Sequence, residues 1–273
     1  MNRRAALLAM LGVAGCAAAP ATPPVEPPAR PIRVMSLNQC TDQLVLALLP
    51  RERIASVTWL ARDPRYSAHA AEAQRVAVNR GSAEEVLRQR PDLIVTDSFS
   101  NPGGRAMLRR LGYPLIELGD ASDVDGITAN VRRLASAMGE RARGETMIAT
   151  MRADLAPPSR PLIRAAVWGR DGMGGGPLLD LALRAAGIAQ VGGSGGTDLE
   201  TLLAADPPYL VTADESGGGA TLGDAKRRHP LVERRWPGDR RFTVAPASLI
   251  CGTPDIAKAA RQLKAQLAAR KIT

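Results

Sequence analysis

Short apolar runs alternate along the chain with stretches in which apolar residues recur every three or four positions. The first pattern predicts strands at 32–37, 53–58, 93–96, 115–118, 162–168, 188–191, 209–212 and 241–244. The second predicts helices at 43–49, 103–111, 178–186, 222–228 and 255–271, besides two short helices that begin near Glu84 and Glu200. Strands that alternate with helices in this way favour mostly parallel sheets covered on both faces. The predicted fold class is therefore α/β.

One passage occurs twice in the chain. Positions 84–96 and 200–212 each predict a short helix with a glutamate near its start, a proline that ends it and a buried strand. The two copies are 116 positions apart, which is too far for a solenoid period. The repeat therefore indicates two Rossmann-like lobes of similar design, at 32–122 and 157–273. Because paired lobes with a groove between them are suited to holding a ligand, we expect a ligand cleft between the lobes.

The segment between the lobes, 123–156, carries a long helical pattern. It predicts a single helix at 124–155 of about 30 residues, which would be about 45 Å long at 1.5 Å per residue. Gly139 and Gly144 are candidate positions for a break or a kink in this helix, and Pro157 and Pro158 end it. A helix of this length is long enough to cross behind both lobes.

Residues 1–16 have the features of an export signal. A basic start at Arg3 and Arg4 precedes the apolar run 5–13, which is too short for a permanent membrane helix. The following Val-Ala-Gly-Cys is similar to the lipobox of bacterial lipoproteins, in which Cys16 would carry the lipid. The alternative is a plain secretory signal cut after one of residues 17–19. Residues 17–31 are rich in Ala and Pro and predict an extended tether, so we expect a periplasmic protein that is lipid-anchored to an envelope membrane.

Composition and charge narrow the function. The net charge of +9 comes largely from scattered arginines, and no basic block with interleaved aromatic residues indicates a nucleic-acid surface. The aromatic content of 3% argues against a large aromatic cage around a ligand. The glycine-rich stretch 172–176 is not followed by the Lys-Ser/Thr of a P-loop, and no Gly-x-Ser-x-Gly elbow occurs. His69 and His229 are the only histidines, so we predict no bare-metal site. The missing motifs predict a protein without enzyme activity, and we also expect a monomer without a cofactor.

The carboxyl ends of the predicted strands give the candidate ligand site, because ligands of open α/β lobes lie beyond these ends. Trp59 either stacks on the ligand or covers the edge of its lobe. Arg80 and Arg170 either clamp acidic groups of the ligand or are simply solvated. The candidate ligand-binding residues are Asn38, Gln39, Cys40, Trp59, Asn79, Arg80, Asp97, Ser98, Arg170, Asp214 and Leu249.

Two cysteines are left once Cys16 is assigned to the lipid. Cys40 and Cys251 are expected in loops that face the groove, one in each lobe. In an oxidising compartment such a pair indicates a disulfide, which would staple the two lobes together. The alternative is a pair of partly buried free thiols.

Several passages resemble the helical-backbone substrate-binding proteins of ABC importers, the group that includes cobalamin and iron-siderophore receptors. The resemblance extends over essentially all of residues 32–271, and no single motif carries it. The passages are 34–38 with 40–42, 50–57 with Trp59, 79–81 with Glu84, 91–95, and 249–254.

This resemblance implies a function in capture and delivery. Members of the group carry one surface glutamate on each lobe, which pairs with arginines of the membrane permease, and these glutamates correspond to Glu84 and Glu200. The alternative is that both only stabilise the first turns of their helices. The implied ligand is a bulky nutrient, a corrinoid or an iron-siderophore complex, although the lining is poorer in aromatic residues than in a typical cobalamin receptor. A haem-binding receptor, and an envelope lipoprotein with a signalling or scaffold role, are the alternatives.

Overall fold

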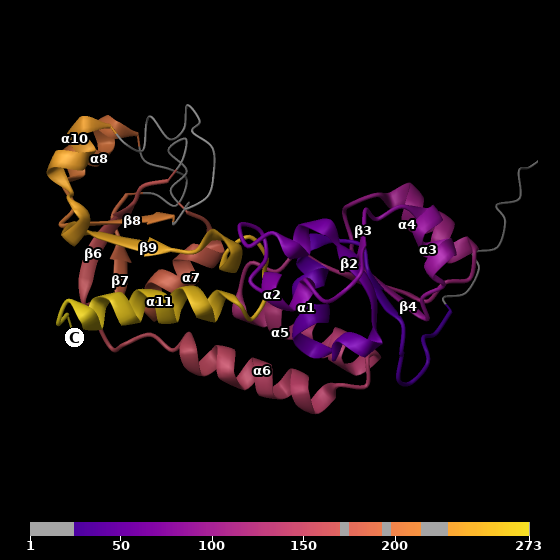
Figure 1. Cartoon of the computed structure of the whole chain (residues 1–273). Coiled ribbons are helices and arrows are strands. Elements are labelled where there is room, and N and C mark those ends of the chain that lie inside the picture. Colours follow the sequence, from indigo (N-terminus) through magenta and orange to yellow (C-terminus); the bar gives the residue numbers. More distant parts are fainter. Residues whose placement is uncertain (1–24, 170–174, 193–197, 214–228, 273) are drawn as a thin grey trace, which may run out of the picture.

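The computed structural model describes residues 25–169, 175–192, 198–213 and 229–272. It consists of two α/β lobes placed side by side, with helices α5, α6 and α11 running between and beneath them (Figure 1). The predicted signal peptide with Cys16, residues 17–24 of the predicted tether, Arg170, Asp214 and the predicted helix 222–228 lie outside the described residues.

The N-terminal lobe contains a five-stranded sheet in the order β3-β2-β1-β4-β5. All of its strand pairs are parallel, as the alternation of strands and helices predicts. The two-residue strand β3 was not predicted, because so short a run has no readable periodicity. The strands are β1 Val34–Ser36, β2 Ile54–Thr58, β3 Val78–Asn79, β4 Leu93–Asp97 and β5 Leu115–Leu118.

The helices of this lobe begin at polar caps. The Ser82 hydroxyl accepts a hydrogen bond from the backbone N–H of Glu85, and the Glu85 carboxylate accepts one from the backbone N–H of Ser82. These two bonds form a capping box at the start of α3. Helix α1 begins four residues earlier than predicted, because the Asn38 side chain accepts from the N–H groups of Cys40 and Thr41. The helices are α1 Gln39–Leu48, α2 Ala70–Ala73, α3 Ala83–Gln89 and α4 Pro102–Arg110, with 3₁₀ turns at Arg51–Arg53 and Trp59–Arg62.

The C-terminal lobe repeats this design with a four-stranded parallel sheet in the order β7-β6-β8-β9. Apart from the helix at 222–228, which lies outside the described residues, its predicted strands and helices agree with the structure to within about two residues at each end. The sequence pattern missed α10. The elements are β6 Ile163–Val167, α7 Pro177–Ala185, β7 Ile188–Gln190, α8 Leu199–Ala205, β8 Tyr209–Ala213, α10 Pro230–Arg235, β9 Arg241–Val244 and α11 Ile256–Ala269, with 3₁₀ turns at Gly238–Arg240 and Pro246–Ser248.

The connection between the lobes differs from the predicted single helix. The chain forms α5 Val124–Ala137 and α6 Arg141–Asp154, each of 14 residues, separated by a turn at Gly139. Gly139 has φ +71°, a left-handed conformation that ends a helix and that glycine adopts without strain. Gly144, in contrast, continues α6, where a Cβ atom would lie 2.6 Å from the Cβ of Ala135 on α5. The second glycine therefore permits close packing of the two helices rather than a kink.

One apolar core continues through both lobes. It contains Val34 on β1, Leu134 on α5, Met151 on α6 and Leu263 on α11, all of them at most 1% exposed. Helices α5, α6 and α11 therefore belong to the core rather than forming an exposed strap, and α6 passes beneath both lobes (Figure 1). Within the described residues, none of the helices combines the length and the apolar character that a membrane span requires.

A buried carboxyl group lies where α1 meets β2. Asp42 is 0% exposed, and both of its carboxyl oxygens accept from the backbone N–H of Thr58 at 3.1 Å. Burial raises the pKa of Asp42 to about 6, and the hydrogen bonds from Ser36 and Thr58 offset only part of that rise. Between the ordinary aspartate pKa and this value, the folded chain holds a proton that the unfolded chain has released. The free energy of unfolding therefore falls through this window as the pH rises.

We predict that Asp42→Asn removes this contribution. Relative to the wild type, the free energy of unfolding of the variant should rise by about 3 kcal/mol between pH 4 and pH 7. This energy corresponds to the rise of the Asp42 pKa from 3.8 in the unfolded chain to about 6 in the folded chain. Urea unfolding at several pH values measures this difference, with Asp239→Asn, an exposed carboxylate, as the control. A difference between the variant and the wild type that does not change with pH would contradict the assignment.

Candidate ligand-binding groove

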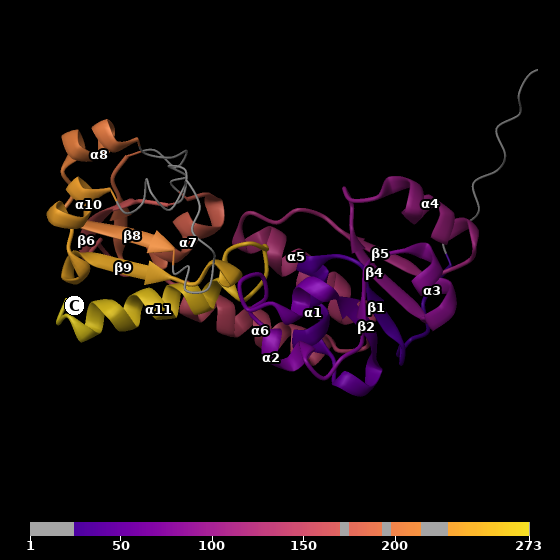
Figure 2. The same cartoon turned by 45° about the horizontal axis from the view of Figure 1, so that its top comes forward.

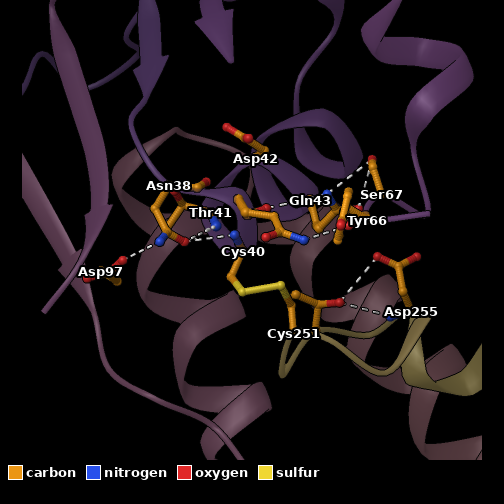
Figure 3. The surroundings of a disulfide bond; sticks show 12 residues. Asn38, Cys40, Thr41, Asp42, Gln43, Tyr66, Ser67, Asp97, Cys251 and Asp255 are labelled. Atoms are coloured by element: carbon orange, nitrogen blue, oxygen red, sulfur yellow. Dashed lines mark hydrogen bonds between the residues drawn. A yellow bond between two sulfur atoms is a disulfide. The ribbon is translucent and has the colours of Figure 1, made fainter. Parts of the chain in front are cut away.

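The two lobes are joined covalently beside the groove. Cys40, in the first turn of α1, forms a disulfide with Cys251, which precedes α11, and the Cα atoms are 5.2 Å apart (Figure 3). The sequence placed Cys40 in a loop, whereas the structure places it in a helix. Next to the bond, a Cβ atom on Gly252 would lie 1.9 Å from the carbonyl oxygen of Ala121. Only glycine fits at this position, because the backbones of the two lobes meet there.

A polar contact lies close to the disulfide. The side chain of Asp255, in the C-terminal lobe, is 3.1 Å from His69 Nε2, in the N-terminal lobe, and 2.8 Å from Lys258 Nζ. Burial on its own would raise the pKa of Asp255, but the hydrogen bonds and charges of His69 and Lys258 outweigh burial and lower the pKa to about 2. The carboxylate therefore stays ionised, and Lys258 Nζ also donates to the carbonyl of Ala68 at 3.2 Å. These contacts and the disulfide fix the position of one lobe relative to the other.

A small cavity of about 110 Å³ opens between the lobes at this junction. Its walls come from the start of α1, the loops that follow β4 and β5, and the segment around Cys251. Asn38, Asp97, Phe99 and Ile250 are among its lining residues. The cavity thus lies at the carboxyl ends of the N-terminal strands, where an open α/β lobe holds its ligand.

A larger, mainly apolar cavity of about 350 Å³ lies at the carboxyl ends of β6, β8 and β9. Val167, Val211 and Val244 form its floor, and Leu249 lines its wall. Leu178 and Ile250 line this cavity and the smaller one together, so the two cavities adjoin. The combined site offers an apolar pocket in one lobe and a more polar pocket in the other.

Large apolar side chains are exposed around this site. Phe99 is 61% exposed and Ile250 is 42% exposed, and both line the smaller cavity. Trp59, which follows the carboxyl end of β2, is 55% exposed, and Tyr66 in the next loop is 39% exposed. Exposed aromatic groups next to a groove favour a ligand with a large apolar surface. The chain has few aromatic residues, but several of them are at this place.

Several of the predicted ligand residues have internal partners. The side chain of Asn38 caps α1 and donates to Asp97, which also accepts from the Phe99 backbone N–H at 2.9 Å and the Ser100 hydroxyl at 2.7 Å (Figure 3). Gln39 Nε2 donates to the carbonyl of Tyr66 at 2.9 Å. Asn38 and Asp97 thus line the cavity, but their polar atoms mainly hold the surrounding loops in place.

The structure places Asn79 in the interior of its lobe rather than in the lining of either cavity. Asn79 is 1% exposed, and its Nδ2 donates to the Ser36 carbonyl and the Ser56 hydroxyl, both at 2.9 Å. It joins β3 to the adjacent strands, since a buried amide must find hydrogen-bond partners inside the protein. Sequence alone did not separate this interior role from a groove position, because both place a polar residue at the end of a strand.

The other predicted residues are more accessible. Arg80, Ser98 and Trp59 are exposed, although none of them lines either cavity, and Leu249 lines the apolar cavity. Phe99, Ile250 and Leu178 line the site but were missed. Phe99 had a usable signal, since it is an apolar residue in an otherwise polar loop just beyond a strand end, and Ile250 lies between the predicted residue Leu249 and Cys251.

The two candidate docking glutamates occupy matching positions. Glu84 and Glu200 lie in the first turns of α3 and α8, which start at the carboxyl edges of their sheets, and both are exposed. Hydrogen bonds from its own backbone N–H and from Ser82 lower the pKa of Glu84, so this side chain is ionised at neutral pH. Within the described residues, no group of three or more potential metal ligands occurs.

Solved structures with the same fold are found, although no protein-family model and no curated protein matches the sequence. A periplasmic haem-binding protein from Pseudomonas aeruginosa is 23% identical, with a TM-score of 0.62, over 86% of this chain and 92% of that one. The periplasmic vitamin B12-binding protein BtuF of Vibrio cholerae is 17% identical, with a TM-score of 0.56, over 89% and 99%. The molybdate-binding protein MolA of Haemophilus influenzae is 14% identical, with a TM-score of 0.65, over 90% and 88%.

These matches define the class of fold. The chain has the two-lobed α/β fold of periplasmic binding proteins with a helical connection between the lobes, as its sequence passages predicted. The matched structures are ligand-binding proteins. Their printed ligands differ widely in size, so the fold by itself does not identify a ligand.

We predict that the disulfide is present in the exported protein. Peptide mapping after thiol alkylation without reductant should recover the peptides of Cys40 and Cys251 joined together. Replacing both cysteines with serine should lower the free energy of unfolding by about 2–5 kcal/mol, because the bond closes a loop of 211 positions and so restricts the unfolded chain. Recovery of both cysteines as separate alkylated peptides would contradict the prediction.

Proposed function

We propose that this protein is the substrate-binding component of an ABC importer, which captures a corrinoid or an iron-siderophore complex in the periplasm and delivers it to a membrane permease. The observation that carries the proposal is the groove, where two adjoining cavities and the exposed side chains of Phe99 and Ile250 meet beside the junction of the lobes. A large ring system with polar edges suits this combination of an apolar pocket and a more polar one. The fold supports the proposal, since the protein matches periplasmic binding proteins over most of its length.

We infer that delivery of the ligand depends on docking of the protein to the permease rather than on a large closing movement of the two lobes. The disulfide and the Asp255–His69 contact hold the lobes together, and α5, α6 and α11 are part of one core. We therefore infer modest movement of the lobes on binding. The exposed Glu84 and Glu200 would pair with basic residues of the permease, where exposed ion pairs determine orientation more than affinity. The lipid on Cys16 would keep the protein at the membrane surface.

Haem is the second candidate ligand. The haem-binding protein from Pseudomonas aeruginosa is among the matched structures, and haem also presents a large apolar ring with charged edges. Both rings suit an amphipathic groove, so a binding measurement has to distinguish haem from a corrinoid.

Tryptophan fluorescence tests the choice of ligand. Trp59 is 55% exposed, and the buried Trp168 lies between Val167 and Gly169, which line the larger cavity, so a ligand in the groove should quench both side chains. We predict saturable quenching by one compound from a panel of cobalamin, cobinamide, haem and small ferric siderophores. The same compound should stabilise the fold by about 2.7 kcal/mol at a hundredfold excess over its Kd. Trp59→Leu should reduce the quenching and weaken binding, with the remaining quenching coming from Trp168. If no compound binds, an envelope lipoprotein with a signalling or scaffold role becomes the better interpretation.

Substitution of Glu84 and Glu200 tests delivery to the permease separately from capture of the ligand. We predict that Glu84→Ala combined with Glu200→Ala abolishes uptake of the compound selected by the titration, with no change in its affinity. Uptake in cells that lack the native gene measures this effect. Glu52→Ala with Glu145→Ala is the control, since these glutamates are also exposed but lie outside α3 and α8. Loss of ligand affinity in the first variant would refute the docking role.

A further inference from the structure

A further cavity, of about 520 Å³, lies outside the ligand groove. Its walls come from α1 and α2 in the N-terminal lobe, from α6, and from the start of α11 in the C-terminal lobe, and we call it the α6–α11 cavity. Helix α6 reaches from the N-terminal lobe to α11 in both views (Figures 1 and 2). Among the described residues, the cavity shares Leu44 with the smaller groove cavity and none with the larger one. It is therefore a separate place at which both lobes meet.

The base of the α6–α11 cavity is apolar. Leu44 and Leu46 on α1 are 2% and 7% exposed, and Met151 on α6 is 1% exposed. These side chains also belong to the core that runs through both lobes. Since the core fixes them in place, the cavity has a preformed apolar wall.

The rim of the cavity is polar and comes mainly from two helices. The α6 residues have the spacing i, i+3, i+4, i+7, which places them on one face of the helix: Arg143, Thr146, Met147 and Thr150. On α11, Lys258 and Arg261 are three positions apart and line the same cavity. Three cationic side chains therefore surround an apolar base.

Arg143 is the cation with most of its donors free. Its Nε donates to the carbonyl of Ala47 on α1 at 2.8 Å, which holds the guanidinium against the cavity wall. Among the described residues, its two Nη atoms have no hydrogen-bond acceptor and no carboxylate forms an ion pair with it. A guanidinium in this state presents a fork of two donors, which fits two oxygens of one anion.

The other two cations are held by carboxylates but add to the positive charge of the rim. Arg261 bonds to Asp154 through Nη1, and no bond to a described residue uses its Nε or Nη2. Lys258 Nζ lies 2.8 Å from Asp255. Arg261 thus keeps donors for a ligand, whereas Lys258 contributes mainly charge.

The carboxylates of the lining are gathered at one end of the cavity. Asp255 lies 3.1 Å from His69 Nε2, and Glu72 lies 3.9 Å from His69 Nδ1. Both therefore belong to the His69 contact, and the charge of Arg143 on α6 remains uncompensated. This difference favours an anion at the Arg143 side of the cavity.

We propose that the α6–α11 cavity is a second binding site, which takes a phosphate group carried on an apolar body. Arg143 contacts the phosphate with its two Nη atoms, Arg261 and the Thr150 hydroxyl lie on the same rim, and the apolar body packs on Leu44 and Met151. A phosphate suits this rim better than a carboxylate, because it offers more acceptor oxygens to several donors. This site does not depend on the proposed function, since it shares neither cation with the groove.

The size of the cavity supports a ligand larger than a free ion. A volume of about 520 Å³ is many times the roughly 30 Å³ that one water molecule occupies in the liquid. A phosphate at the rim would leave the apolar base in contact with water, whereas an attached apolar chain would cover that base. The phosphate and the chain should therefore bind better together than either does alone.

Isothermal titration calorimetry of the protein purified from the cell envelope tests this proposal. The probes are hexyl phosphate, inorganic phosphate and 1-hexanol, which separate the two parts of the ligand. We expect saturable binding of hexyl phosphate, and binding of each of the other two at least about tenfold weaker. Arg143→Gln should weaken hexyl phosphate binding about tenfold, because it removes a charge-assisted pair of hydrogen bonds. Arg143→Lys, which keeps the charge but not the fork, should weaken it less.

Arg133→Gln is the matched control, because Arg133 is also an exposed helical arginine but lies on α5, outside the cavity lining. This variant should bind hexyl phosphate like the wild type, and thermal melting should show that all variants fold. Equal affinity of Arg143→Gln and the wild type, or equal affinity for hexyl phosphate and inorganic phosphate, would overturn the proposal. Neither outcome affects the proposed function, which the fluorescence titration of the groove tests separately.

A competition experiment identifies the source of the phosphate. Dihexanoyl phosphatidylglycerol, used below its micelle concentration, carries the anionic headgroup of a membrane lipid. Displacement of hexyl phosphate by this lipid, with the same loss in Arg143→Gln, would support the site and assign it to a membrane phospholipid. Binding of hexyl phosphate without displacement would support the site and assign it to a soluble phosphate ester. Equal displacement by dihexanoyl phosphatidylcholine, which has no net charge, would overturn the selection for an anion.

Discussion

The junction between the lobes is the constraint on which the rest of the structure depends. Each lobe completes its own sheet, so nothing within a lobe sets the width of the groove. That width is set where Cys40 is bonded to Cys251, where the backbone at Gly252 meets Ala121, and where Asp255 contacts His69. All of these contacts lie beside the carboxyl ends of the strands. Fixing them therefore fixes the ligand cavities as well.

Two buried carboxyl groups near this junction show how partners decide the effect of burial. Asp42 has only hydroxyl and N–H donors around it, and burial raises its pKa to about 6. Asp255 is almost as well buried, but His69 and Lys258 lower its pKa to about 2. Asp42 favours folding at lower pH, whereas Asp255 favours it at higher pH. Near pH 6, where Asp42 on α1 loses its proton, Asp255 is therefore already ionised and keeps its charge in the contact between the lobes.

The groove and the outer helices are separate parts of the surface, and the proposed function assigns capture to the first and delivery to the second. The lining of the groove comes from loops beyond the strands, and such loops vary most easily on an unchanged scaffold. This explains how one fold serves haem, vitamin B12 and molybdate in the matched structures. The helix pairs α3 with α4 and α8 with α10 lie outside the groove and repeat each other closely. A surface repeated in this way is suited to a partner that stays the same whatever the ligand.

The sequence by itself determined the two α/β lobes, the order of most strands and helices, and the equivalence of Glu84 and Glu200, because these depend on local periodicity and on a repeat. It offered Gly139 and Gly144 as possible breaks in a single connecting helix, and the structure shows two helices with the turn at Gly139. Only the tertiary structure decided that Asn79 is an interior residue, that Cys40 meets Cys251, and that Phe99 and Ile250 line one cavity. The physical reason is that burial and contact between distant segments depend on how the lobes pack, which local pattern does not encode.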